Sequence, residues 1–205
     1  MDVPLATVAG FALTSLIIEL TPGPNMVYLA ILTLGEGRRA GFAAVAGVTL
    51  GLLVLGVVAA VGSDALALNS PAVYQVMRWG GVIYLLWLAW DDWRDAGSSI
   101  GPVTVTSPWR YFARGLITNM LNPKAGIFYI AVLPNFLDSS RPVVGQAVLL
   151  TVLYVAIATA IHASIVTLAG TALPLLEDRR RELIIRRVLA LALVTVAGWL
   201  AWSTR

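Results

Sequence analysis

The chain has 205 residues, of which 59% are hydrophobic and 12% charged, with no cysteine and a formal net charge of +3. Soluble domains carry roughly 25% charged residues, so this balance and a mean hydropathy of +0.83 indicate an integral membrane protein, and the missing cysteines exclude disulfides, thiolate nucleophiles and cysteine-ligated metals. Most basic residues lie in short turns between apolar runs, which is a signal of membrane topology and excludes a nucleic-acid partner.

Six stretches are long and apolar enough to cross a bilayer, whose hydrocarbon core takes about 20 helical residues. In chain order they cover residues 4–33, 40–62, 73–90, 111–137, 144–168 and 188–202. The first four residues lack the basic region of a cleavable signal peptide, so we expect the first span to be retained. The pattern predicts an all-α, polytopic membrane protein with one transmembrane domain over residues 1–205.

The first span is interrupted by the run Thr21, Pro22, Gly23, Pro24 and Asn25. Proline lacks the backbone N–H and glycine costs backbone entropy, so this run divides the span into two half-helices. Backbone groups freed in hydrocarbon persist only where protein buries them or where they line a wet cavity. The break is therefore the first candidate binding site, and a proline kink that neighbouring helices compensate is the structural alternative.

The basic residues predict the orientation of the chain, because cytoplasmic loops hold the excess of lysine and arginine. The loops after the first, third and fifth spans hold Arg38, Arg39, Arg94, Arg110, Arg114, Arg179, Arg180, Arg181, Arg186 and Arg187. The opposite side carries little beyond Arg141, Arg205 and Arg78, which stands near the start of the third span. We therefore predict that both termini lie outside, with a cytoplasmic loop over residues 94–110.

A second break, at Asn122, Pro123 and Lys124, lies about a hundred residues after the first. The tetrapeptide Trp-Leu-Ala-Trp also ends the third span, at 87–90, and the sixth, at 199–202. Two interrupted helices in matching positions are typical of transporters built from inverted repeats, with a site near the midplane. We predict two inverted three-helix halves, about 1–93 and 111–205, with helices 1 and 4 broken. Chance is the alternative, since interfacial tryptophans and proline kinks are common.

The two interrupted motifs, Thr21 to Asn25 and Asn122 to Ala125, resemble the signatures of the LysE/RhtB family of amino-acid exporters. The turn at 37–41 and the run 81–87 add to the resemblance, which covers the whole chain. It implies a secondary transporter of the bacterial inner membrane that exports amino acids or close derivatives, driven by the proton or another ion gradient. The sequence shows no Gly-rich phosphate loop, no paired carboxylates at catalytic spacing and no nucleophile near a base, so we expect neither an enzyme nor a cofactor binder.

The residues of the breaks suit a zwitterionic amino acid. A half-helix that begins after Pro24 presents free N–H groups and the positive end of its dipole to a carboxylate. Asn25 and Asn122 supply amides that either contact the substrate or cap freed backbone groups, and both alternatives stay open. The expected substrate-binding residues are Thr21, Pro22, Gly23, Pro24, Asn25, Asn122 and Pro123.

Glu19 is the single acidic residue well inside an apolar span, two positions before the first break. An ionisable group at that depth is a candidate for proton coupling or for binding the substrate ammonium, and Lys124 is its natural partner. The alternative is a Glu19–Lys124 ion pair that only ties the halves together. The scarcity of other intramembrane charges favours a neutral amino acid as substrate.

Other polar or small residues of the spans predict packing. His162 stands alone in the fifth span, so packing or a hydrogen bond is expected there and a metal site is not. Gly47 and Gly51, and the trio Ala156, Ala160 and Ser164, indicate close helix contacts, with a homodimer as the alternative. Two other functions stay open: export of inorganic cations, which the missing ligand sets oppose, and a non-transporting membrane module that holds a partner.

Overall fold

The computed structural model describes residues 3–21, 23–61, 71–97 and 107–171, together with scattered positions between 184 and 202. In these residues all regular secondary structure is helical, which confirms the predicted fold class. The predicted sixth span, 188–202, lies largely outside the described residues. The inverted arrangement of six spans therefore remains a prediction.

The first predicted span forms two helices, α1 (Leu5–Leu20) and α2 (Pro24–Glu36), whose axes are bent by 55° at the predicted break. Gly37 ends α2 with a φ of +86°, a conformation that side-chain-bearing residues rarely adopt. The chain thereby turns directly into the unbroken helix α3 (Arg38–Val61).

The fourth predicted span is also broken where expected. Helix α5 (Pro108–Met120) meets α6 (Pro123–Ile127) at a bend of 52°, and α6 continues as the π-helix η1 (Phe128–Val132) and the 3₁₀-helix η2 (Leu133–Phe136). The fifth predicted span is the single helix α7 (Val143–Thr171).

The third predicted span lies in α4 (Pro71–Gly97), which continues seven residues past the predicted end at Trp90. The start of the predicted loop 94–110 is therefore helical. Hydropathy marks the point where a chain leaves the lipid, whereas a helix ends only where its backbone bonds end, and the polar run from Asp91 to Asp95 contains no helix breaker.

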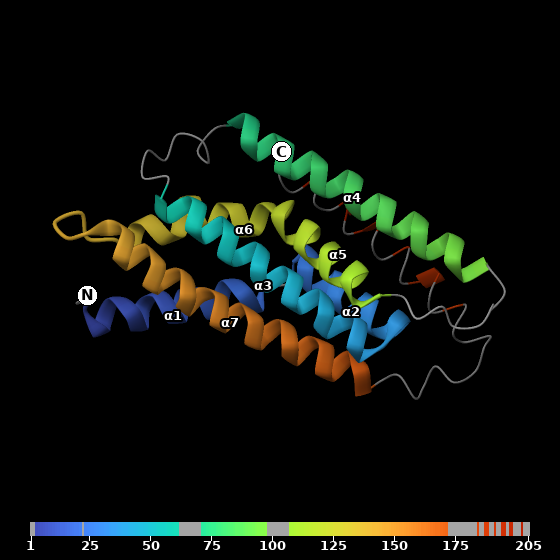
Figure 1. Ribbon diagram of the computed structural model, residues 1–205. Coiled ribbons are helices and arrows are strands. Elements are labelled where there is room, and N and C mark those ends of the chain that lie inside the picture. The colour runs from blue at the N-terminus through green and yellow to red at the C-terminus, as the bar shows by residue number, and fades with distance from the viewer. Residues whose placement is uncertain are drawn as a thin grey trace.

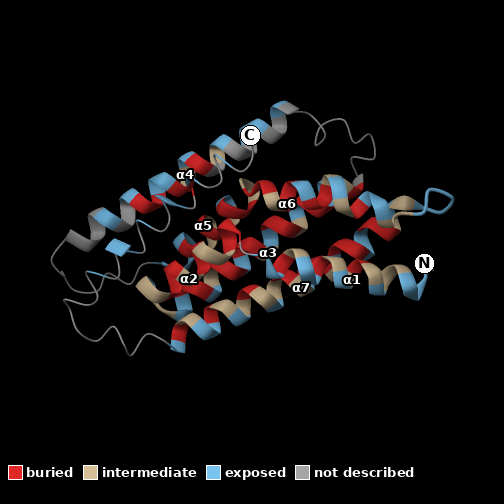
Figure 2. Ribbon diagram, turned by 180° about the vertical axis from the view of Figure 1, so that it is seen from behind, coloured by how far each residue is buried: buried red, intermediate tan, exposed pale blue. Residues whose placement is uncertain are grey.

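Among the described residues, two helices are long and apolar enough to cross a membrane, and four spans are available if each bent pair counts as one. The N-terminus and the turn before α7 lie at one end of the molecule, and the turn between α2 and α3 lies at the other (Figure 1). Exposed residues follow the outer faces of α1, α4 and α7, while α2, α3 and α5 carry much of the buried surface (Figure 2). Many exposed side chains are large and apolar, as lipid contact requires.

Helix α3 is the centre of the bundle and packs against α2, α5 and α7. It crosses α5 with direct backbone contact, because a Cβ at Gly47 would overlap the carbonyl oxygen of Phe112, and one at Gly115 would overlap that of Ala44. The predicted packing role of Gly47 is thus confirmed. The trio Ala156, Ala160 and Ser164 is instead exposed on α7. The prediction of close packing within the chain is wrong there, since α7 buries a different face that includes Leu150 and Tyr154.

Within the described residues, the buried apolar side chains form two clusters, one toward each end of the bundle. One contains Tyr28, Leu32 and Ala44, on the side of the α2–α3 turn. The other contains Phe11 and Phe128, on the side of the N-terminus and the turn before α7. Both helix breaks lie between these clusters, so the polar residues near them are enclosed from both directions along the bundle.

Candidate functional site

The two helix breaks adjoin each other in space. The ammonium of Lys124, in the second break, donates a 2.8 Å hydrogen bond to the backbone carbonyl of Thr21 in the first. A buried bond of 2.8 Å also joins Nδ2 of Asn25, in the first turn of α2, to Oδ1 of Asn119, in the last turn of α5. Segments about a hundred residues apart in the sequence therefore share one interior region.

The N-termini of the two half-helices are satisfied differently. Asn122 caps α6 by accepting a 3.0 Å hydrogen bond from the backbone N–H of Lys124. Gly23, at the equivalent place before α2, has no side chain that could do the same, and Pro24 occupies the first helical position. The first turn of α2 therefore keeps N–H groups without a side-chain cap, which together with the helix dipole favours a negative charge nearby.

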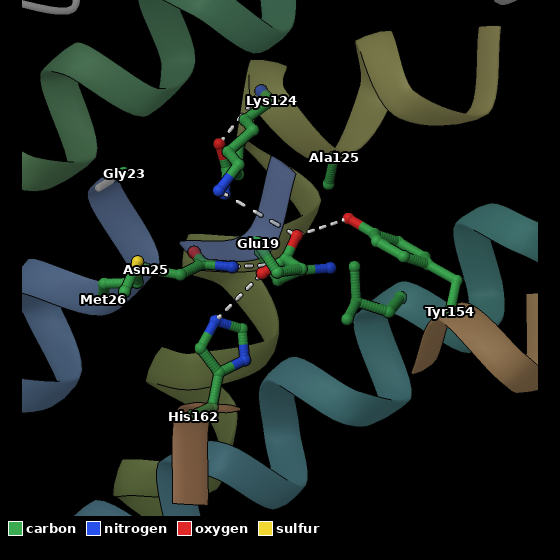
Figure 3. A pocket seen from close by; sticks show the side chains of 11 residues that line it. Glu19, Gly23, Asn25, Met26, Lys124, Ala125, Tyr154 and His162 are labelled. Carbon is green, nitrogen blue, oxygen red and sulfur yellow. Dashed lines mark hydrogen bonds and ion pairs between the residues drawn. The ribbon is translucent and has the colours of Figure 1, made fainter. Parts of the chain in front are cut away.

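Glu19 is the centre of the polar cluster between the breaks. It lies near the C-terminal end of α1 and is only 4% exposed. Its Oε1 accepts a 2.7 Å hydrogen bond from the hydroxyl of Tyr154, and its Oε2 lies 3.6 Å from Nε2 of His162. The ammonium of Lys124 lies 4.0 Å from Oε1. These three side chains approach the carboxylate from different sides (Figure 3), so three donor-bearing groups from two other helices surround one buried acid.

Aromatic rings close one side of this cluster. The ring of Tyr154 stacks on Phe128 with 3.6 Å between centroids and an interplanar angle of 10°. Tyr129 meets Tyr154 edge-on at 5.6 Å, and Phe11 meets Phe128 edge-on at 5.7 Å. The hydroxyl of Tyr129 is held by the carbonyl of Leu52 in α3. The π-helix η1 carries both Phe128 and Tyr129, so it supplies the two rings that pack against Tyr154, the hydrogen-bond donor to Glu19.

A small cavity with a volume of about 10 Å³ lies among these groups, and it has room for about one water molecule. Its wall combines a carboxylate, an ammonium, an imidazole, a phenol and three amides with apolar side chains. The lining residues are Glu19, Gly23, Asn25, Met26, Leu52, Asn119, Asn122, Lys124, Ala125, Tyr154 and His162. In the described part of the chain, no three His, Cys, Asp or Glu side chains gather as a metal site requires.

The sequence of the chain was compared with those of known protein families. The sequence model of the LysE type translocator matches residues 16–204. The chain belongs to this family. Proteins of the LysE type are membrane transporters rather than enzymes, and this confirms the membership and the general class of protein predicted from the sequence.

Several curated relatives of this LysE-type translocator are efflux proteins. The homoserine/homoserine lactone efflux protein of Salmonella typhimurium is 30% identical over 161 residues, which cover 78% of each chain. The leucine efflux protein of the same organism is 29% identical over 167 residues, or 76% of this chain and 75% of the relative. The leucine efflux protein of Enterobacter sp. is 32% identical over 138 residues, or 65% and 64%. No solved structure matches the chain.

Most residues predicted for the site lie at the cavity of the translocator. Glu19, Gly23, Asn25, Asn122 and Lys124 line it. Pro24 and Pro123 are buried where they begin α2 and α6, and Pro22 lies outside the described residues. Thr21 contributes its backbone carbonyl, which accepts a hydrogen bond from Lys124.

Three polar lining residues were not among the predicted site residues. Asn119 lies one turn before the second break, and Tyr154 and His162 lie two turns apart on the unbroken helix α7. Each is a polar residue in an apolar run. This pattern indicates a buried polar group with a role, but it does not indicate which residues that group contacts. For His162 packing or a hydrogen bond was expected, and the structure places its Nε2 beside Glu19.

Proposed function

We propose that the chain exports a neutral amino acid or a close derivative from the cytoplasm, through the cavity between its two broken helices, driven by the proton gradient. The observation that carries this proposal is the meeting of both breaks at one buried acid-lined cavity. The relatives support the substrate class, because homoserine and leucine are both amino acids with uncharged side chains.

The charges around the cavity complement the two ends of a zwitterion. The uncapped first turn of α2 and the ammonium of Lys124 favour the substrate carboxylate. Glu19 favours the substrate ammonium, and the buried Oδ1 of Asn25, which has no hydrogen-bond partner among the described residues, can accept from it. The only other polar groups of the lining are uncharged amides, His162 and Tyr154, so the cavity offers no second carboxylate to a basic side chain.

The cavity in this structure is too small for any amino acid, because it has room for about one water molecule. We therefore interpret the structure as a closed state between inward-facing and outward-facing forms. The two apolar clusters enclose the cavity from the two ends, as alternating access requires. Opening on either side must separate the side chains of one cluster.

We also propose the orientation and the membrane. The arginine-rich turn that joins α2 to α3 faces the cytoplasm, and both termini face outside. The curated relatives are bacterial, which supports the inner membrane of a bacterium as the location. In this orientation the cluster with Phe11 and Phe128 closes the outer side, and the cluster with Tyr28 and Leu32 closes the cytoplasmic side.

The test is exchange across a lipid membrane. Purified protein is reconstituted in liposomes loaded with unlabelled L-homoserine or L-leucine, and uptake of the same labelled amino acid is followed without an ion gradient. We expect saturable exchange in the wild type and its loss in Pro24→Ala and Asn122→Ala, which alter the two breaks. Thr167→Ala serves as the control, since that exposed hydroxyl bonds only within α7. A wild type that exchanges no neutral amino acid in a panel of twenty candidates and derivatives contradicts the proposal.

A further inference from the structure

His162 is the only histidine in the 205 residues, and it is buried within the membrane region at 2% exposure. Its Nε2 faces Glu19 at 3.6 Å, while its Nδ1 is buried with no hydrogen-bond partner among the described residues. With a hydrogen on Nε2, the neutral ring serves Glu19 and keeps a lone pair on Nδ1. The ring can therefore accept a second proton without giving up its contact with the carboxylate.

We propose that His162 carries the coupling proton and that this proton competes with the substrate ammonium for Glu19. The inference rests on the proposed export function and adds to it the identity of the proton-bearing group. In this mechanism the proton gradient acts by protonating His162. The resulting imidazolium and the substrate ammonium both need the carboxylate of Glu19.

The charges that face His162 explain the competition. Glu19 faces it from α1 and Lys124 lies across that carboxylate on α6, while Tyr154 on its own helix is a neutral donor to Glu19. The side chains that α2 and α3 add to the cavity lining, such as Asn25 and Leu52, are uncharged. One carboxylate is thus shared by one fixed cation and the imidazole. An imidazolium and a substrate ammonium on the same carboxylate repel each other strongly where water is excluded.

The alternative proton acceptor, Glu19 itself, fits the geometry less well. A proton on Oε1 would compete with the hydrogen bond that Tyr154 donates to this atom, and a proton on Oε2 would face the Nε2–H of His162. A neutral acid also leaves Lys124 and the Nε2–H of His162 without the charge that they face. Protonation of His162 instead strengthens the same set of contacts.

Competition for the carboxylate of Glu19 couples inward movement of a proton to outward movement of an amino acid. A proton that arrives from outside binds Nδ1 of His162, and the resulting imidazolium pairs with Glu19 and disfavours the substrate ammonium. When the cavity opens to the cytoplasm, the amino acid binds Glu19 and the proton leaves His162 to the cytoplasm. The site changes the side to which it opens while Glu19 is paired with either the imidazolium or the substrate ammonium. An inward proton gradient therefore drives the amino acid outward.

The single histidine allows a direct test on the intact protein. The chain is produced with ¹⁵N-labelled histidine and purified by a tag without histidine, so that its imidazole gives the only labelled signal. At a pH where both ring forms are populated, saturating L-homoserine is expected to lower the ratio of imidazolium to neutral ring about tenfold, an ordinary coupling between two ligands. L-leucine is the second probe. A ratio that stays constant or rises while the amino acid demonstrably binds overturns the inference.

Two variants complete the test. In Glu19→Gln the shared carboxylate is absent, so the histidine signal is expected not to respond to either amino acid. In His162→Gln we expect an acidic exterior to stop accelerating efflux from liposomes, so that the ratio of rates with and without the pH gradient falls to about one. Acceleration that persists in His162→Gln overturns the inference, and the ring signal of the wild type decides if this variant is inactive.

The inference and the proposed function can fail separately. Exchange of homoserine or leucine without any gradient tests only the site and its substrate class. If the wild type exchanges an amino acid and the histidine ring does not respond to it, His162 is not the proton carrier and the export function stands. If no neutral amino acid exchanges, the function itself is wrong.

Discussion

The side-chain amides of Asn25 and Asn119 are hydrogen-bonded to each other at 2.8 Å across the two broken helices. Gly51 of α3 lies directly behind this pair, since a Cβ there would come within 2.7 Å of Nδ2 of Asn119. The bond is fully enclosed by α2, α3 and α5. It fixes the first turn of α2 against the last turn of α5, and so sets the distance between the two breaks.

Replacing Asn25 by alanine should therefore affect both stability and transport. The change leaves Oδ1 of Asn119 buried without its donor, which costs about 1–3 kcal/mol, and lets the start of α2 move relative to α5. We expect a lower unfolding temperature and at least tenfold slower exchange of L-homoserine. Thermal unfolding and liposome exchange are measured together, and an unchanged exchange rate would show that the Asn25–Asn119 bond does not shape the site.

Gly115→Ala should destabilise the protein strongly, because the new methyl group would overlap the backbone carbonyl of Ala44. Backbone atoms cannot turn aside as a side chain can, so the cost should reach or exceed about 3 kcal/mol, the upper range for overpacking. Gly35→Ala is the matched control, since it also adds a methyl group to a helix and meets nothing within 4 Å. Unfolding in detergent should separate the two variants, and equal stability would contradict the close crossing of α3 and α5.

Tyr154→Phe and Tyr129→Phe form a matched pair of hydroxyl deletions in one aromatic group. Tyr154 donates to the charged Glu19, whereas Tyr129 donates to the backbone carbonyl of Leu52. We expect Tyr154→Phe to alter the pH profile of transport while its ring still stacks on Phe128. Tyr129→Phe should lower stability by about 1 kcal/mol and leave the profile in place. Identical pH profiles for the two variants would remove Tyr154 from the polar cluster.

Lys124→Gln should weaken substrate binding more than it weakens folding. The side chain of Lys124 is partly exposed, and its ammonium donates a hydrogen bond to the carbonyl of Thr21. Loss of the positive charge removes attraction for the substrate carboxylate, so we expect the KM for L-homoserine to rise about tenfold or more. The amino alcohol homoserinol, which lacks the carboxylate, should not be affected in the same way. Equal effects on both compounds would place the carboxylate elsewhere.

Local chemistry made the helix breaks predictable. Proline has no backbone N–H wherever it stands, so Pro24 and Pro123 divide their spans in the sequence and in the structure alike. Glu19 was identifiable for a similar reason, because a charge within an apolar run is costly in any arrangement of helices. These features depend on a few neighbouring residues and hardly at all on the rest of the fold.

The partners of Glu19 were not predictable in the same way, apart from Lys124 beside the second break. His162 and Tyr154 reach it because α7 packs against α1 and α2, and this depends on contacts between helices that one sequence does not specify. The π-helix at Phe128–Val132 likewise has no sequence signal, although it carries the ring that stacks on Tyr154. The predicted role of Asn122 was open between cap and ligand, and the structure shows it as a cap that also lines the cavity.

The glycine-mediated crossing of α3 and α5 limits how the transporter can change shape. Main-chain atoms are in contact at Gly47 and Gly115, so no side chains lie between α3 and α5 where they cross. We therefore expect the two helices to move together as one rigid unit, although they come from different halves of the sequence. Conformational change then falls to contacts made by side chains, where α1 and α2 meet α7. If the N-terminal half rotated as a whole against the C-terminal half, the contact between α3 and α5 would have to break. We therefore expect the parts that move to be smaller than either half.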